Sequence, residues 1–391
     1  MKQIFHIFIN SLKRSCLQLV QRRFMLLMMT AMPLFCAWFM LDLMKSGAIE
    51  RAPVALIDLD NSSLSRNLQR NLAAMQGLHI TEEFDSFHDA MRALQRGDVL
   101  GFFYIPPRLE QRTLAGEHPL VSYYINYAYF APASQQLKGY KTVSLLANGS
   151  IAMTTIEATG LVGGHNIMSV LQPVLTHVHG ISNPWMNYSY YLNMSFVPCL
   201  LALFVLLATA TSIGNELKYN TTREWLDSAG GSMWIALTGK LLPHTVVFVA
   251  VGWLVQCLMF RVYGLPLHGN PWNMILAMLL FVPACQAFAV AMFCFAPNYR
   301  YGATLCTLMG MLSFSFCGFS LPGEAMYPII NAVGYIMPVR HYFLISADQA
   351  LNGIDIYFSR WHYAILIIYL LLPLPMLWRL KHECKNPLYL P

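Results

Sequence analysis

Few residues in this 391-residue chain have the types and spacing that catalysis requires. Asp58 and Asp60 could act as a general acid and a general base, since paired carboxylates can divide these roles when their environments differ. Asn61 and Ser62 follow directly, and such residues commonly end a strand and cap the next helix. The sequence therefore favours a turn with a helix cap over a catalytic pair.

Metal and nucleotide chemistry are also unsupported by the sequence. His177 and His179 are two residues apart, so on a helix their side chains would point in different directions, and we interpret them as surface residues. The only glycine–lysine pair that resembles part of a phosphate-binding loop, Gly239-Lys240, is followed by Leu241 and lacks the upstream glycine. We expect no catalytic residue, no metal and no cofactor, and no ATP hydrolysis by this chain itself.

The composition is that of a membrane protein. Hydrophobic residues make up 56% of the chain and charged residues only 11%, whereas soluble domains carry about 25% charged residues. Apolar runs long enough to cross a bilayer predict about six transmembrane helices. The last run is short unless Trp361 and Trp378 anchor it at the two interfaces. The predicted spans are 24–41, 192–213, 241–260, 272–296, 302–320 and 362–379.

Two segments outside these spans have a different character. Residues 1–23 combine helically spaced apolar residues with five Lys and Arg, which predicts a helix along the membrane surface. Residues 42–191 contain ten of the 25 Lys and Arg and twelve of the 19 Asp and Glu, which indicates a folded water-exposed domain. Alternating strand and helix patterns there predict a mixed α/β fold with a partly parallel sheet, in which a long helical segment follows the fourth strand. The fold class is thus an α-helical polytopic membrane protein with an inserted α/β domain.

The distribution of Lys and Arg predicts the orientation. With the N-terminus inside, the cytoplasmic segments hold twelve Lys and Arg and the short outside loops hold three. We expect both termini and the tail 380–391 to be cytoplasmic, and residues 42–191 to lie outside. The net charge of +6 is then a topology signal and does not indicate nucleic-acid binding.

The segment 214–240 is the most informative of the predicted cytoplasmic segments. It is charged on one side and carries apolar residues on the other, which suits a short interfacial helix that docks on a partner. An ordinary solvated loop explains the pattern equally well. Glu216, Thr222, Arg223, Glu224, Leu226 and Lys240 lie in this segment.

The segment 321–345 follows the fifth predicted span. Its prolines interrupt a helix, yet it is too apolar for an ordinary loop, and irregular backbone at membrane depth must be covered by protein or line a cavity. The alternative is a hydrophobic loop packed on the outside domain. The residues singled out in and just before this segment are Gly318, Phe319, Pro322, Met326, Pro328, Pro338 and Tyr342.

The order of these features resembles ABC-2-type permeases, the membrane subunits of bacterial ABC exporters. The T-x-E-x-L…G-K pattern after Glu216 resembles the coupling helix of that family, and Gly318–Pro328 resembles its G-F-x-x-P-x-x-x-M-P signature with Tyr327 inserted. The strand before Asp58 resembles the subfamily with a large periplasmic domain after the first span. The resemblance implies a type V exporter-like permease fold, in which the six residues named above in 214–240 dock on an ATPase. It also implies that 321–345 forms short re-entrant helices in the outer leaflet.

The resemblance also implies a function and partners. It implies efflux of a drug, small molecule or lipid-like substrate, driven by ATP that a separate ABC ATPase subunit hydrolyses. A second permease chain, a periplasmic adaptor protein and an outer-membrane channel are expected partners, with membrane lipid around the spans of the bacterial inner membrane. A non-transporting receptor or scaffold is the alternative, and a membrane-embedded enzyme would need catalytic residues that the sequence does not display.

Overall fold

The computed structural model describes residues 2–47, 51–75, 77–115, 117, 119–159, 183, 187–319 and 323–385. The chain divides into two compact units. One comprises Ser46–His179, and the other combines Met1–Lys45 with Gly180–Pro391. The α/β unit thus begins four residues after the predicted position 42 and ends twelve residues before 191.

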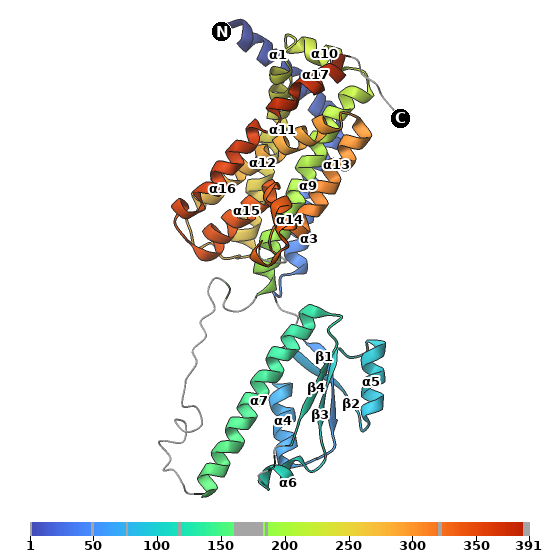
Figure 1. Cartoon of the computed structure of the whole chain (residues 1–391), viewed down its shortest axis with the longest axis vertical. Coiled ribbons are helices and arrows are strands. Elements are labelled where there is room, and N and C mark those ends of the chain that lie inside the picture. The colour runs from blue at the N-terminus through green and yellow to red at the C-terminus, as the bar shows by residue number, and fades with distance from the viewer. Residues whose placement is uncertain are drawn as a thin grey trace. The chain divides into compact units, whose positions relative to one another are not determined.

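The α/β unit is built on a four-stranded sheet (Figure 1). The strand order is β2-β1-β3-β4, in which β1 pairs parallel with β2 and β3, and β4 pairs antiparallel with β3. This partly parallel sheet was expected from the alternation of strands and helices. The strands are β1 (Ala52–Asp58), β2 (Leu78–Glu83), β3 (Gly101–Ile105) and β4 (Ser122–Ile125).

Helices cover both faces of this sheet. Side chains alternate along β1, so Val54 and Leu56 enter one core and Ala55 and Ile57 enter the other. Leu68 and Leu72 of α4 pack in the first core together with Val143 of α7, and α5 packs in the second core. The helices are α4 (Ser63–Ala73), α5 (Phe87–Arg96), α6 (Leu109–Leu114) and α7 (Phe130–Thr159).

Asp58 and Asp60 hold the turn that follows β1. Oδ1 of Asp58 accepts hydrogen bonds from the backbone N–H groups of Asp60 (3.0 Å) and Asn61 (3.1 Å). The Asp60 carboxylate accepts from the N–H groups of Leu109 (2.8 Å) and Glu110 (3.2 Å), and Ser62 forms a capping box with Ser65. Both carboxylates therefore satisfy backbone donors, as the interpretation as a turn and helix cap predicts.

Replacing Asp60 by alanine is expected to lower the free energy of unfolding of the α/β unit by about 1–2 kcal/mol, because two backbone donors at the start of α6 lose their acceptor. Urea denaturation of a fragment spanning residues 46–179 measures this value. Asp89→Ala is the matched control, since Asp89 makes an exposed ion pair with Arg92 and should change stability by less than about 0.5 kcal/mol. Equal stability of both variants would contradict the capping role.

The other unit is a bundle of helices. Five stretches within the described residues are long and apolar enough to cross a membrane: Arg23–Leu43, Tyr188–Lys218, Met233–Val262, Pro271–Phe295 and Ile356–Lys385. They consist of α2 (Arg23–Met29) with α3 (Ala31–Leu43), α9 (Tyr188–Lys218), α11 (Met233–Cys257) with η1 (Leu258–Val262), α12 (Pro271–Phe295), and α16 (Ile356–Ile368) continued by η4 (Tyr369–Leu371), η5 (Leu374–Met376) and α17 (Leu377–Lys385).

Three predicted spans differ from these helices. α11 begins eight residues before position 241, since the buried charge of Lys240 is paired with Glu216. The fifth predicted span, 302–320, corresponds to α13 (Tyr299–Phe316), which packs along α9 but has Arg300 in its first turn. The sixth begins at Ile356 instead of 362, and its helix is interrupted around Pro373 because proline lacks a backbone donor.

The predicted surface helix is α1 (Lys2–Gln21). Its buried face carries Ser11, Ser15 and Leu19 at four-residue intervals, and it packs on α11. A Cβ atom on Gly239 of α11 would lie 2.6 Å from Oγ of Ser11, so glycine permits this close approach. The apolar residues Phe5, Ile9, Leu17 and Val20 stay exposed, which suits contact with a membrane surface.

Candidate functional site

The helices α1, α9, α10, α11 and α17 meet at the end of the bundle where Figure 1 places α1, α10 and α17. We call this region the α10 end. α9 ends at Lys218, Asn220 adopts a left-handed backbone conformation (φ 55°), and α10 (Thr222–Ser228) follows. Gly230 (φ 61°) and Gly231 (φ 75°) then turn the chain into α11. Two tight turns therefore hold α10 between α9 and α11.

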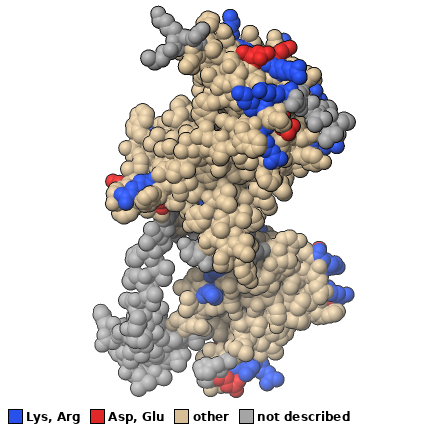
Figure 2. All heavy atoms as spheres, turned by 45° about the horizontal axis from the view of Figure 1, so that its top comes forward, with Lys and Arg blue, Asp and Glu red and all other residues tan. Residues whose placement is uncertain are grey.

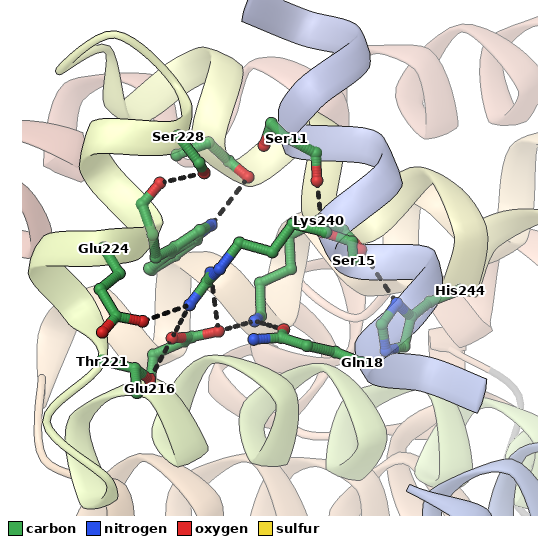
Figure 3. Close-up of polar contacts among 12 residues, drawn as sticks. Ser11, Ser15, Gln18, Glu216, Thr221, Glu224, Ser228, Lys240 and His244 are labelled. Carbon is green, nitrogen blue, oxygen red and sulfur yellow. Dashed lines mark hydrogen bonds and ion pairs between the residues drawn. The ribbon is translucent and has the colours of Figure 1, made fainter. Parts of the chain in front are cut away.

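A buried ion-pair network joins these helices (Figure 3). Glu216 of α9 is fully buried and accepts two hydrogen bonds from the Arg14 guanidinium of α1, at 3.2 and 3.1 Å. Nζ of Lys240 in α11 donates to Oε1 of Glu216 at 2.6 Å, and the Thr221 hydroxyl donates to Oε2. One carboxylate thus binds α1, α11 and the turn before α10, and each of its oxygens is satisfied.

Lys240 and Trp225 extend this network beneath α10. The Lys240 side chain is 2% exposed; Nζ also donates to Oε1 of Gln18 at 3.3 Å and lies 5.1 Å from the centre of the Trp225 ring. Nε1 of Trp225 donates to the backbone oxygen of Ala236 at 3.1 Å. Trp225 therefore anchors α10 on α11 through an apolar surface, one hydrogen bond and a cation–π contact.

The outer face of α10 is charged. Arg223, Glu224 and Asp227 are exposed, whereas Trp225 and Leu226 are buried beneath them. Glu224 also lies 4.0 Å from Arg14, so the exposed face is adjacent to the buried network. Figure 2 shows Lys, Arg, Asp and Glu gathered at this end, while most of the visible flank of the bundle carries no charge. The charged surface of α10 thus lies directly above buried side chains that connect it to α9 and α11.

The structure separates the six predicted docking residues into two groups. Arg223 and Glu224 lie on the outer face of α10. The other four, Glu216, Thr222, Leu226 and Lys240, are buried and hold α10 in place.

Sequence reasoning missed Arg14, Gln18 and Thr221 as members of the network. The small residues Ser11 and Ser15 at four-residue spacing, which indicate a helix face that packs closely on a neighbour, are the signal that could have placed Arg14 beside α9 and α11.

The second predicted segment forms η2 (Gly323–Ala325), α14 (Pro328–Tyr335) and α15 (Pro338–Ser346), followed by η3 (Ala347–Asn352). Pro328 and Pro338 begin α14 and α15, a position that tolerates proline. Tyr342 is buried, accepts a hydrogen bond from Nε2 of Gln256 at 3.0 Å and stacks on Phe281. α15 therefore packs into the bundle against α11 and α12.

The remaining residues predicted in this segment are dispersed. Gly318 has a left-handed backbone conformation (φ 99°) after α13, which suits glycine. Phe319 is 9% exposed and packs edge-on against Tyr191 and Phe196 of α9. Met326 lies half-buried between η2 and α14, and Pro322 lies outside the described residues.

Arg340, which was not predicted, is buried in α15. Its guanidinium lies 4.0 Å from the centre of the Tyr335 ring and donates to the backbone oxygen of Asn331 at 3.2 Å. Its charge is therefore held by an aromatic ring and a carbonyl of the short helix α14, which fixes α14 against α15.

Among the described residues, no group of three or more His, Cys, Asp or Glu could hold a metal ion. His177 and His179 lie outside the described residues. His341 and His362 approach each other, with Nδ1 atoms 3.2 Å apart, but Nε2 of His341 is already bonded to the backbone oxygen of Tyr335. The polar side chains of the α10 end and of the α14–α15 segment thus connect helices to one another.

Comparison with known proteins identifies the class of the chain. No curated protein sequence matches it significantly. A family profile described as ABC-2 family transporter protein matches residues 23–379, which covers the bundle from α2 to Arg379, the α/β unit and both segments described above, while α1 lies before the match. The chain therefore belongs to the ABC-2 family of transporters, as the order of its sequence features indicated.

Proposed function

We propose that this chain is the permease subunit of an ATP-driven exporter, and that α10 receives the movement of a separate ABC ATPase subunit. The family implies an ATPase partner. The observation that carries the proposal is the buried network of Arg14, Glu216 and Lys240, which links the exposed face of α10 to two long apolar helices. A push on α10 would move α9 and α11 together with α1, because their charges cannot separate without exposing a buried, unpaired ion.

The orientation and surroundings belong to the same proposal. The twelve Lys and Arg of the α10 end and the predicted inside loops support an orientation with both termini in the cytoplasm of a bacterial cell and the α/β unit in the periplasm. There the α/β unit would meet an adaptor protein that leads to an outer-membrane channel. Two permease chains would form the pathway for a drug, small molecule or lipid-like substrate. α14 and α15 would line its outer part as re-entrant helices.

Charge reversal on α10 tests the contact with the ATPase. Glu224→Lys should lower permease-dependent ATP hydrolysis at least about tenfold, because an exposed charge on a docking face would meet a partner charge of the same sign. The measurement is ATP hydrolysis by the complex that copurifies with the tagged chain in mild detergent. Glu117→Lys is the matched control, since Glu117 is an exposed glutamate of the α/β unit.

Two outcomes would contradict the proposal. Unchanged ATP hydrolysis by the Glu224→Lys complex would remove α10 from the ATPase interface. Purification without any ATPase subunit would favour the receptor or scaffold over the exporter.

A further inference from the structure

A cavity of about 570 Å³ lies beside the α10 end, where α1 meets α2. Residues of the α1–α2 junction, α9 and α13 line it. It is separate from the Glu216 network: none of the residues of that network lines the cavity. The proposed function assigns it no role.

The lining changes from polar to apolar along the helices. Arg22, Arg23, Asn215 and Tyr219 stand at one end, where the candidate span Arg23–Leu43 begins. Phe204 lies eleven residues before Asn215 on α9, which corresponds to about 17 Å at 1.5 Å per residue. Met28, Leu207 and Ala208 line the cavity on the apolar side. The cavity therefore suits a lipid-like molecule. Its polar head group would lie at the end lined by Arg22 and Arg23, and its apolar tail would extend along the apolar lining.

The polar end is positively charged and uncompensated. Arg22 and Lys218 lie over the Tyr219 ring, at 5.7 and 5.6 Å from its centre. Within the part of the chain that the structure describes, no carboxylate lies within ion-pair distance of Arg22, Arg23 or Lys218. This contrasts with Arg14 eight residues earlier, whose charge is bound by Glu216. A cluster of cations at a membrane boundary attracts an anionic head group.

The wall formed by α13 depends on a glycine. A Cβ atom on Gly214 would lie 2.0 Å from Cδ2 of Tyr299, so the Tyr299 ring lies directly against the backbone of α9. Lys218 lies 5.9 Å from the centre of the same ring. The Tyr299 ring thereby leaves the cavity open for a ligand and borders the charged end of the cavity.

We propose that this cavity binds one anionic phospholipid of the adjacent leaflet, with its phosphate at Arg22, Arg23 and Lys218 and an acyl chain between α2 and α9. No residue of α14 or α15, which the proposed function places along the substrate pathway, lines this cavity. The bound lipid would hold the junction of α1 and α2 against α9 from the lipid side, as Glu216 holds α1 from the protein side.

Native mass spectrometry of the full chain in mild detergent tests the site. The chain is incubated with phosphatidylglycerol or with phosphatidylcholine of the same acyl composition. Wild type should retain phosphatidylglycerol in preference, and Arg22→Gln/Arg23→Gln should bind it about thirtyfold more weakly, since each basic residue near the membrane surface contributes about five- to sixfold. Arg22→Lys/Arg23→Lys keeps the charge and should stay within about threefold of wild type.

Two further comparisons test whether retention depends on this cavity, and not on the total positive charge of the chain or on an added aromatic side chain. Arg379→Gln removes an exposed cation of α17 outside the cavity and should leave retention unchanged. Ala208→Phe fills the apolar part and should reduce retention at least about tenfold, whereas Leu276→Phe on exposed α12 surface should not.

Soluble glycerol phosphate distinguishes a lipid from a free phosphate and should not displace the bound phospholipid. Equal retention of both lipids by wild type, unchanged retention by the Gln pair or by Ala208→Phe, or displacement by glycerol phosphate would each overturn the proposal.

Discussion

Glu216→Gln is expected to lower the free energy of unfolding of the helical bundle by about 3–5 kcal/mol. The substitution keeps the size of the side chain but leaves the Lys240 ammonium, which is 2% exposed, without a counter-charge. It also weakens the paired hydrogen bonds from Arg14. Denaturant titration of the purified chain in detergent, followed by tryptophan fluorescence, measures the change.

A double variant tests whether the loss of stability comes from an unpaired Lys240 charge or from the absence of the Glu216 carboxylate itself. Glu216→Gln/Lys240→Met should recover part of the loss, because the ammonium that is 2% exposed is gone, while Arg14, which is 20% exposed, keeps among the described residues only Glu224 at 4.0 Å as a counter-charge. Glu224→Gln is the exposed control and should stay within about 0.5 kcal/mol of wild type. A stability of Glu216→Gln equal to that of Glu224→Gln would show that the buried pair does not hold the helices.

Trp225→Ala should have an effect of similar size, about 3–5 kcal/mol, because it empties a fully buried aromatic site between α10 and α11. It also removes the hydrogen bond to Ala236 and the ring beneath Lys240. The exposed charges of α10 are unchanged, yet α10 would lose its fixed position. We therefore expect permease-dependent ATP hydrolysis to fall together with stability.

Trp225→Phe is the matched control. It retains an aromatic ring but not the donor, so it should cost about 1–2 kcal/mol and leave most ATP hydrolysis intact. Limited proteolysis at Arg223 reports the position of α10 directly, because cleavage should be faster in Trp225→Ala than in Trp225→Phe. Equal cleavage rates would contradict the anchoring role of Trp225.

Much of the fold could be predicted from the sequence because its signals are local. Strand runs between turn residues predicted the sheet, and Ser86 and Gly97 cap α5 as their residue types suggest. The boundaries of the spans were less accurate. A run free of charge excluded Lys240 from the third span, although a helix can include a lysine when a carboxylate from another helix neutralises it.

The candidate site could be predicted only in part, since its decisive contacts join distant parts of the chain. The segment around α10 was recognised from its charges and its apolar residues. Its sequence does not reveal that Glu216 faces inward and Glu224 outward, because that depends on how α1 packs on α11. Arg14 counted as one of several basic residues near the membrane, and only the tertiary structure distinguishes it from Arg22.

The contact between Arg14 and Glu216 has a consequence for biosynthesis. The two residues are 202 positions apart, so at 5–20 residues per second about 10–40 s pass between their syntheses. During that interval α1 has none of its partners in α9, α10 or α11, and its exposed apolar residues can only rest on the lipid. The N-terminal helix therefore completes its docking after most of the chain has been inserted. A chain that stops before Glu216 would leave Arg14 without its carboxylate, and one that stops between Glu216 and Lys240 would leave Glu216 without its buried lysine.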